Sequence, residues 1–224
     1  GMIVADTIPA PRAGQYWRKR RAVQRHRLDA ARTAANDALQ HCRTPENGES
    51  MDIAVIGGGN GAYAAAADLA EQGHRIRLWR RDTAALAPLR EAGGIELIDF
   101  RGRRQIPLAL ITSDAGEAIS GADLLVSPLP AFAQADVAHA IAPHLSSGQV
   151  IYLPPGTFGS CVMARAIADA GGPHDIAIAE AGTLPWLTRK AGVAAVVITT
   201  RATRLPSGVF PARRSDEAFA VLEQ

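Results

Sequence analysis

The 224-residue chain lacks several features that mark particular classes of protein. Its two cysteines, Cys42 and Cys161, are too few for a disulfide framework, and they show no metal-ligand spacing with the six histidines. We therefore expect a reducing, cytoplasmic setting and no metal site. No apolar run approaches the length of a membrane span, and the start lacks the apolar core of a secretory signal. These absences predict a protein without membrane association.

Net charge and aromatic residues are also low. A net charge of +2 is too small to imply a nucleic-acid partner by itself, and only 5% of the residues are aromatic. Hydrophobic residues nevertheless make up 47% of the chain, which is enough for a sizeable core. Because much of this fraction is alanine, and glycine is abundant, the composition favours close packing of helices on a sheet.

Residues 1–50 differ from the rest, because arginine outnumbers the acidic residues there. We expect a basic extension with a helix over Tyr16–Gln40 and a linker over Pro45–Ser50. The run Arg18–Arg21 has two interpretations. It is either a basic patch for nucleic acid or an anionic membrane, or a solvated face of an extension outside the fold. We favour the second, since short basic runs occur widely without function.

The most informative stretch is Met51–Asp82. It begins with the apolar run Ile53–Ile56, which is typical of a strand buried on both faces. A glycine-rich turn over 57–62 follows, and then a helical pattern with alanines along one face. Gly73 ends this helix, and Arg75–Arg80 has the pattern of a second strand.

The glycine-rich turn matches the dinucleotide fingerprint G-x-G-x-x-G/A in the strand–helix–strand context that gives it weight. Gly57 permits the tight turn out of the strand. Gly59 has no Cβ, so a pyrophosphate can approach the backbone, and the helix start offers free N–H groups and a positive dipole end. The alternative is a glycine-rich turn in an unrelated α/β domain. The expected cofactor-binding residues here are Gly57, Gly59, Asn60, Gly61 and Ala62.

The residues at the end of the second strand bear on which cofactor binds. An acid there would bind the ribose of NAD, whereas an arginine accommodates the 2′-phosphate of NADP. The chain has Arg80 and Arg81, followed by Asp82. Since the guanidinium fork matches phosphate, we favour NADP, with NAD as the alternative if the two arginines are only solvated charges.

The rest of the chain alternates short strands with helices, which predicts a doubly wound, mainly parallel α/β sheet of the Rossmann type with the first strand central. We expect strands at 95–100, 104–108, 109–112, 124–126, 150–153, 176–179 and 194–199, the first two as a hairpin inserted on this sheet. We expect helices at 83–92, 114–120, 132–144 and 160–170.

Two proline segments follow predicted strands, where ligands of such sheets bind. Rigid residues there could shape a wall for adenine and nicotinamide, although proline and glycine are also ordinary turn residues. The candidates are Pro128, Leu129, Pro130, Pro155 and Gly156.

Several segments together resemble the N-terminal domain of the octopine/nopaline (opine) dehydrogenase family, from Met51 to about Ala212. The resemblance lies in IAVIGGGNGAYAAAADLAEQGHRIRLW, GADLLVSPLPAFA, QVIYLPPGTFGS, AEAGTLPWLTR and GVFPA. It implies an NAD(P)-binding Rossmann domain over 51–212 and NAD(P)H-dependent reduction of the imine formed from an amino acid and a 2-oxo acid. It also implies substrate-lining roles for Glu180, Thr183, Pro185 and Trp186.

The chain departs from the family pattern in two respects. Gln134 stands where the family often has a histidine. The family's catalytic His and Asp lie in a helical second domain, which should begin close to Gln224, the last residue of this sequence. We expect residues 213–224 to begin that domain, with Ser215–Leu222 as its first helix. The catalytic residues are therefore unknown, and we expect this chain alone to bind dinucleotide without turning over an opine substrate. An apolar face left exposed would favour a homo-oligomer.

Two other functions share the opening motif. One is a reductase of the ketopantoate or glycerol-3-phosphate dehydrogenase type, against which the TLPW segment argues. The other is a non-catalytic nucleotide-binding module, such as a sensor. Whether the chain is itself an enzyme is therefore left open by the sequence.

Overall fold

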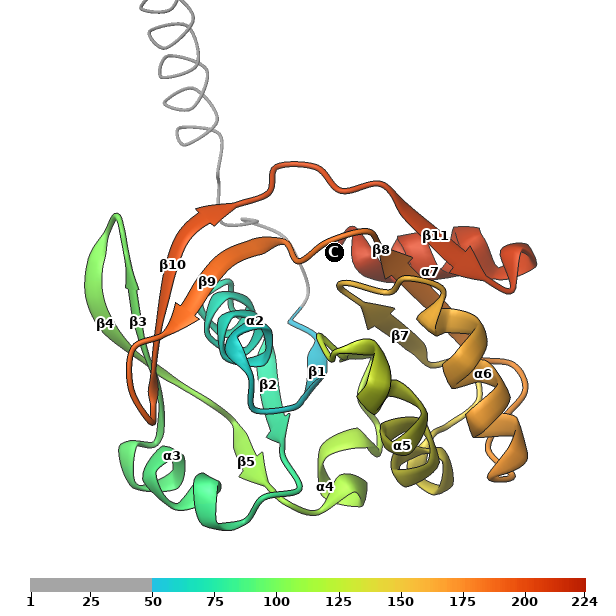
Figure 1. The fold of residues 1–224 in the computed structure, drawn as a ribbon, viewed down its shortest axis with the longest axis horizontal. Helices are drawn as coiled ribbons and strands as arrows, with labels where there is room; N and C mark the ends of the chain where they lie inside the picture. The colour runs from blue at the N-terminus through green and yellow to red at the C-terminus, as the bar shows by residue number, and fades with distance from the viewer. Residues whose placement is uncertain (1–49) are drawn as a thin grey trace, which may run out of the picture. The chain divides into compact units, whose positions relative to one another are not determined.

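The computed structural model describes residues 50–224. The helix and the basic run predicted nearer the N-terminus lie outside these residues. A seven-stranded sheet, which we call the main sheet, runs through the described part in the order β11-β8-β7-β6-β1-β2-β5 (Figure 1). All neighbouring pairs are parallel except β11 with β8, and β1 lies between β6 and β2. The predicted mainly parallel sheet with a central first strand is therefore confirmed. Its strands are β1 (Asp52–Ile56), β2 (Arg75–Trp79), β5 (Leu110–Thr112), β6 (Leu124–Val126), β7 (Val150–Leu153), β8 (Ala177–Ala181) and β11 (Ser207–Phe210).

Both faces of the main sheet are covered at its central strand, β1. In β1, Ile53 and Val55 belong to the core that includes α2, whereas Ala54 and Ile56 belong to the core formed with α4, α5 and α6. This alternation is the period-two geometry of a strand buried on two faces. The helices are α2 (Asn60–Glu71), α3 (Ala87–Ala92), α4 (Ala115–Ile119), α5 (Ala131–Ile141), α6 (Gly159–Asp169) and α7 (Ser215–Leu222), with short 3₁₀ turns at Ala84–Leu86, Ala142–His144 and Ala212–Arg214.

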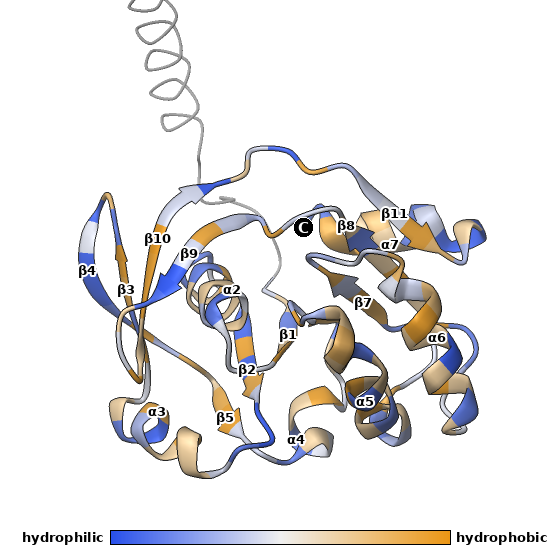
Figure 2. Cartoon of the chain, in the orientation of Figure 1, coloured by the Kyte–Doolittle hydropathy of each residue, from blue (hydrophilic) through white to orange (hydrophobic). Residues whose placement is uncertain are grey.

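A second sheet of four strands has the order β4-β3-β10-β9. The predicted hairpin exists as β3 and β4, but its placement on the main sheet was wrong, because β3 pairs with β10 in this second sheet. The strand predicted at 194–199 also lies here, and β9 and β11 were not predicted. The edge strand β4 is mostly hydrophilic, whereas β3 and β10 are more hydrophobic (Figure 2). The strands are β3 (Gly94–Asp99), β4 (Gly102–Pro107), β9 (Trp186–Lys190) and β10 (Ala195–Arg201).

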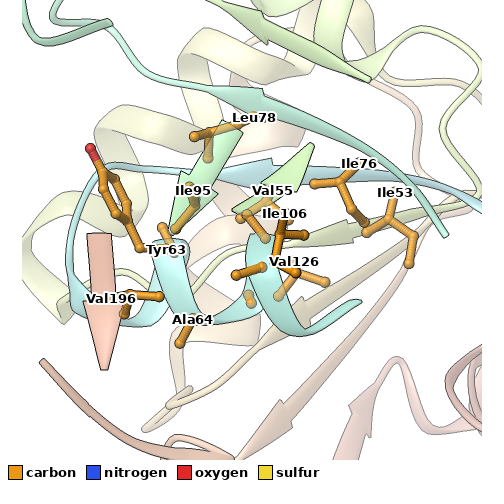
Figure 3. Packing of buried hydrophobic residues seen from close by; sticks show 14 of the residues in the cluster. Ile53, Val55, Tyr63, Ala64, Ile76, Leu78, Ile95, Ile106, Val126 and Val196 are labelled. Carbon is orange, nitrogen blue, oxygen red and sulfur yellow. The ribbon is translucent and has the colours of Figure 1, made fainter. Parts of the chain in front are cut away.

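Helix α2 lies between the two sheets, and this position explains its composition. The whole run Gly61–Asp68 is buried, not only the alanine face predicted to lie on the main sheet. Figure 3 shows Tyr63 and Ala64 of α2 among side chains from strands of both sheets, including Val55 and Val196. Apart from Asp68, which accepts hydrogen bonds from Trp186 and Arg201, this buried run carries no charge, and its small residues let both sheets approach the helix axis.

A network of charged residues ties α2 to the second sheet. The Arg201 guanidinium donates to Asp68 of α2 at 2.6 Å and to Asp99 of β3 at 3.0 Å. Arg104 of β4 donates to Asp99 at 2.7 Å and also to Glu71 of α2. The Asp99 side chain is 0% exposed, so its charge depends on these two arginines. Hydrogen bonds from Arg104 and the other arginines hold the pKa of Asp99 far below its usual range, against the opposing effect of burial.

Candidate functional site

The strand order of the main sheet reverses between β1 and β6. From β1 the chain builds β2 and β5 on one side, and β6, β7 and β8 on the other. In open α/β sheets, ligands bind beyond the carboxyl ends of the strands at this point. The two loops that leave it are in contact, since a Cβ on Gly57 would lie 3.0 Å from Leu129 and one on Gly61 would lie 2.9 Å from Pro128. The structure therefore brings the fingerprint and the first proline segment together.

The glycine loop has the geometry that the fingerprint requires. Gly57 turns the chain at φ +117°, a conformation that side-chain-bearing residues rarely adopt. Gly59 precedes α2 in an extended conformation, and a Cβ built on it would meet no atom of the described residues within 4 Å. No side chain in the described part of the chain caps this helix start. The first N–H groups of α2 therefore have no side-chain acceptor among the described residues, and an anion at Gly59 could accept hydrogen bonds from them.

Arg80 lies against this loop at the end of β2. A Cβ on Gly58 would lie 2.6 Å from Arg80 Cδ, so the arginine stem covers the loop directly. Its guanidinium pairs with Asp82 at 3.2 Å. Asp82 also accepts the Ala85 N–H at 3.2 Å, which fixes the carboxylate at the start of a 3₁₀ turn. Arg81 is exposed.

Lys190, at the end of β9, is a further charged residue at this loop that sequence reasoning did not identify. Its backbone N–H donates to Asn60 Oδ1 at 2.9 Å, and its ammonium lies 3.4 Å from the Gly58 carbonyl oxygen. The ammonium also lies 3.9 Å from the ring centre of Tyr63, a cation–π distance. Burial and the nearby Arg80 lower the pKa of Lys190. The sequence carries little signal for β9, because burial alternates along WLTRK but hydrophobicity does not: Leu187 is exposed and Thr188 is buried.

The second proline segment is held by two polar side chains. Gln134, buried in α5, donates to the Gly156 carbonyl at 3.3 Å. The Glu180 carboxylate accepts the N–H groups of Phe158 at 3.2 Å and Ser160 at 2.9 Å, so it caps the start of α6. A Cβ on Gly156 would lie 2.1 Å from the Glu180 Cβ, which shows how closely the loop and β8 approach. Glu180 therefore positions the loop that follows Pro155.

The TLPW segment runs alongside the glycine loop. A Cβ on Gly61 would lie 2.9 Å from Leu184, and Thr183 is exposed. Trp186 is only 8% exposed, and its indole N–H donates to Asp68 at 2.7 Å. This geometry gives Trp186 a packing role between α2 and the second sheet. Contact of Glu180, Thr183, Pro185 and Trp186 with a substrate remains a prediction.

Two further properties of residues 50–224 bear on the kind of site. They contain no group of three or more His, Cys, Asp or Glu side chains arranged to hold a metal ion. None of their helices is long and apolar enough to cross a membrane.

Comparison with known sequences gives matches to two kinds of enzyme. Residues 52–158 match the family model for the N-terminus of NAD-dependent glycerol-3-phosphate dehydrogenase. The opine dehydrogenase of Arthrobacter sp. (strain 1C) is 30% identical over 173 residues, covering 76% of this chain and 48% of that protein. A glycerol-3-phosphate dehydrogenase [NAD(P)+] of Nitratidesulfovibrio vulgaris (strain DP4) is 37% identical over 102 residues, covering 45% of this chain and 30% of that protein.

Two kinds of solved structure resemble this chain at the level of the fold. Octopine dehydrogenase in complex with NADH and agmatine has a TM-score of 0.64 at 23% identity, covering 72% of this chain and 42% of that one. A ketopantoate reductase from Ralstonia eutropha JMP134 has a TM-score of 0.56 at 20% identity, covering 77% of this chain and 53% of that one. The chain spans about half the length or less of these relatives.

The fold and the glycine loop define a Rossmann-type NAD(P)-binding domain of an oxidoreductase. Within that class, the described part of the chain is similar to the N-terminal NAD-binding domain of opine dehydrogenases. The resemblance inferred from the sequence motifs is thereby confirmed.

Proposed function

We propose that this domain binds NADPH at the carboxyl ends of β1, β2 and β6 for an oxidoreductase of the opine dehydrogenase type. Such an enzyme would reduce the imine formed from an amino acid and a 2-oxo acid. The observation that carries the cofactor assignment is the position of Arg80, whose side chain lies directly over Gly58 of the fingerprint. Arginine at the end of β2 suits the 2′-phosphate of NADP, and Asp82, the acid that would serve NAD, is already paired.

The residues of this chain would act by binding and orienting the cofactor, which supplies the hydride when bound. The open N-terminus of α2 at Gly59 would receive the pyrophosphate. Arg80 and Arg81 would lie near the 2′-phosphate. The segments Pro128–Pro130 and Pro155–Gly156, the latter held by Glu180 and Gln134, would form the wall against which adenine and nicotinamide lie.

The opine reaction is preferred because the opine dehydrogenase match extends over 173 residues, whereas the glycerol-3-phosphate dehydrogenase match covers 102. The glycerol-3-phosphate reaction is the second candidate, since a family model with that description matches residues 52–158. A panel of amino acids with 2-oxo acids, glycerone phosphate and ketopantoate, followed by NADPH absorbance, separates these reactions.

Dinucleotide binding is tested first, by titrating the chain with NADPH and NADH and following cofactor fluorescence. We expect tighter binding of NADPH, and loss of that preference in Arg80→Gln/Arg81→Gln. Tighter NADH binding, or an unchanged preference in the double variant, would overturn the NADP assignment. Failure of both dinucleotides to bind would overturn the proposed function.

For turnover, we expect the chain alone to be ineffective. A positioned general acid contributes roughly 10²–10⁴-fold to such reactions, and no residue of the described part is assigned that role.

Phe132 and Phe158, exposed at 86% and 79%, follow the two proline segments and give this edge an apolar surface. On that basis we propose self-association of the chain, and from its cysteine content a cytoplasmic location.

A further inference from the structure

We propose that Lys190 is the second cation, with Arg80, that holds the 2′-phosphate of the dinucleotide. This inference rests on the proposed NADPH binding and adds a residue that no sequence motif at the fingerprint indicates. Lys190 is about 110 residues beyond Arg80 in the chain, and it reaches the glycine loop only because β9 belongs to the second sheet.

Lys190 is held at the loop by three contacts. Its backbone N–H donates to the Asn60 side chain at 2.9 Å, which fixes the end of β9 beside the fingerprint. Its ammonium lies 3.9 Å from the centre of the Tyr63 ring and 3.4 Å from the Gly58 carbonyl oxygen. Tyr63 is itself fixed, because its hydroxyl donates to the Val193 carbonyl at 2.8 Å. The ammonium is therefore presented by a rigid frame, which reduces the entropy lost when it binds a ligand.

The charges at this loop are unbalanced. Arg80 and Lys190 both lie against Gly58, and the pKa of Lys190 is lowered by burial and by its neighbour Arg80. Asp82 pairs with Arg80, and no carboxylate of residues 50–224 forms an ion pair with Lys190. Asp82 therefore compensates only one of the two positive charges, and Arg80 and Lys190 repel each other. A phosphate monoester, which carries close to two negative charges at neutral pH, would compensate both.

The position of the pair favours the 2′-phosphate over the pyrophosphate. Both cations contact Gly58, whereas the pyrophosphate belongs at Gly59 and the start of α2. Arg80 also ends β2, where adenosine-ribose contacts are made in this fold. We therefore expect Lys190 to contribute to phosphate recognition on the adenosine ribose and little to the pyrophosphate.

The test uses two probes that separate the phosphates. Adenosine 2′,5′-bisphosphate carries the 2′-phosphate without a pyrophosphate, and adenosine 5′-diphosphate carries the reverse. Lys190→Met keeps an unbranched side chain of similar length and removes the charge. By calorimetry on the 224-residue chain, it should weaken the bisphosphate about tenfold or more, the affinity carried by one charge-assisted contact, and leave the diphosphate within about twofold.

The matched control is Arg189→Met. Arg189 is the neighbouring residue on β9, is exposed, and donates only to the Thr188 carbonyl among the described residues. Removing its charge should leave both affinities within about twofold, because its screened charge is not at the loop. Lys190→Arg should retain most of the bisphosphate affinity, since it restores a cation.

A second measurement needs no substitution. Acetic anhydride should acetylate Lys190 in the free chain, and the bisphosphate should slow this reaction, as measured by mass spectrometry of the digested protein. The diphosphate should protect Lys190 less. This measurement decides the question if Lys190→Met does not fold.

Three results would overturn the proposal. Equal weakening of both probes by Lys190→Met would assign Lys190 to the pyrophosphate or to the frame of the loop. Unchanged binding of both probes, or equal protection by both, would remove it from the site. If the unmodified chain binds neither probe nor NADPH, the proposed function fails as well. Normal binding of NADPH with no effect of Lys190→Met rejects only this inference.

Discussion

Replacing Gly59 with alanine should separate the stability of this domain from its ability to bind dinucleotide. A Cβ at this position meets no described atom within 4 Å, and the backbone angles, φ −83° and ψ −176°, suit any residue. Alanine is a poorer helix N-cap than glycine, which costs up to about 1 kcal/mol. The less flexible unfolded chain offsets this by about 0.4–1 kcal/mol. The free energy of unfolding should therefore change by less than about 1 kcal/mol.

Binding should respond very differently. The new methyl group would stand in the space through which a pyrophosphate approaches the first N–H groups of α2. One charge-assisted hydrogen bond contributes about 1.5–3 kcal/mol, so losing a single contact lowers affinity roughly 10- to 150-fold. NADPH fluorescence titration gives the affinity, and urea unfolding gives the stability.

Gly208→Ala is the matched control. Gly208 lies on the edge strand β11, and a Cβ there also meets no described atom within 4 Å. It should change neither NADPH affinity nor stability by much. The reasoning fails if Gly59→Ala binds NADPH as tightly as the parent, because the open space at Gly59 would then not be the phosphate site. Gly61→Ala is less informative, since its Cβ would press on Leu184 and Pro128 at 2.9 Å.

Three other outcomes are expected from the polar contacts. Trp186→Phe removes the indole donor to Asp68, so the free energy of unfolding in urea should fall by about 1–3 kcal/mol. NADPH affinity should stay within about twofold, and a large loss of affinity at unchanged stability would instead place Trp186 in the site. Glu180→Gln weakens the cap of α6 and should lower the unfolding free energy by about 1–2 kcal/mol, and an unchanged melting temperature would contradict this role. Arg104, above all, lowers the pKa of Asp99 in the folded state. Ionised Asp99 therefore stabilises the fold fully above its unfolded-state pKa of about 4, and this contribution is lost as pH falls from there through the folded-state pKa. Unfolding free energies measured between pH 7 and pH 3 should therefore decline, with a shallower decline in Asp99→Asn; identical slopes would refute the assignment.

The part of the fold that could be predicted from the sequence is the part fixed by local pattern. The unit from β1 to β2 combines a buried strand, a glycine turn and a periodic helix, so each element supports its neighbours. Helix α7 has the bounds expected for it, Ser215–Leu222, but that expectation came from the resemblance to the opine dehydrogenase family and not from a local pattern. The contact between the glycine loop and Pro128–Leu129 followed from the general rule for the ends of parallel strands.

The second sheet was not predictable in the same way. Nothing local identifies the partner of β10, because Ala195 pairs in parallel with Glu96 about a hundred residues earlier. β9 is short and begins directly after Pro185, so it resembled a loop. Lys190 was missed for the same reason, since its place beside Gly58 depends on that sheet. The candidate site residues predicted from the sequence are those carried by motifs, whereas the position of Lys190 depends on long-range pairing.

This pairing also determines the order in which the domain can be completed. While the chain is being synthesised, β3 and β4 can form a hairpin early, but the sheet over α2 must wait for β9 and β10. Until then, Tyr63 and the inner side chains of the hairpin, Ile95 and Leu97, lack the neighbours that bury them. Contacts between segments that are far apart in the sequence form slowly, and the apolar surface exposed in the meantime favours aggregation. Expression of chains that end before β9 should therefore give protein prone to aggregate, even though the fingerprint and the first βαβ unit are complete.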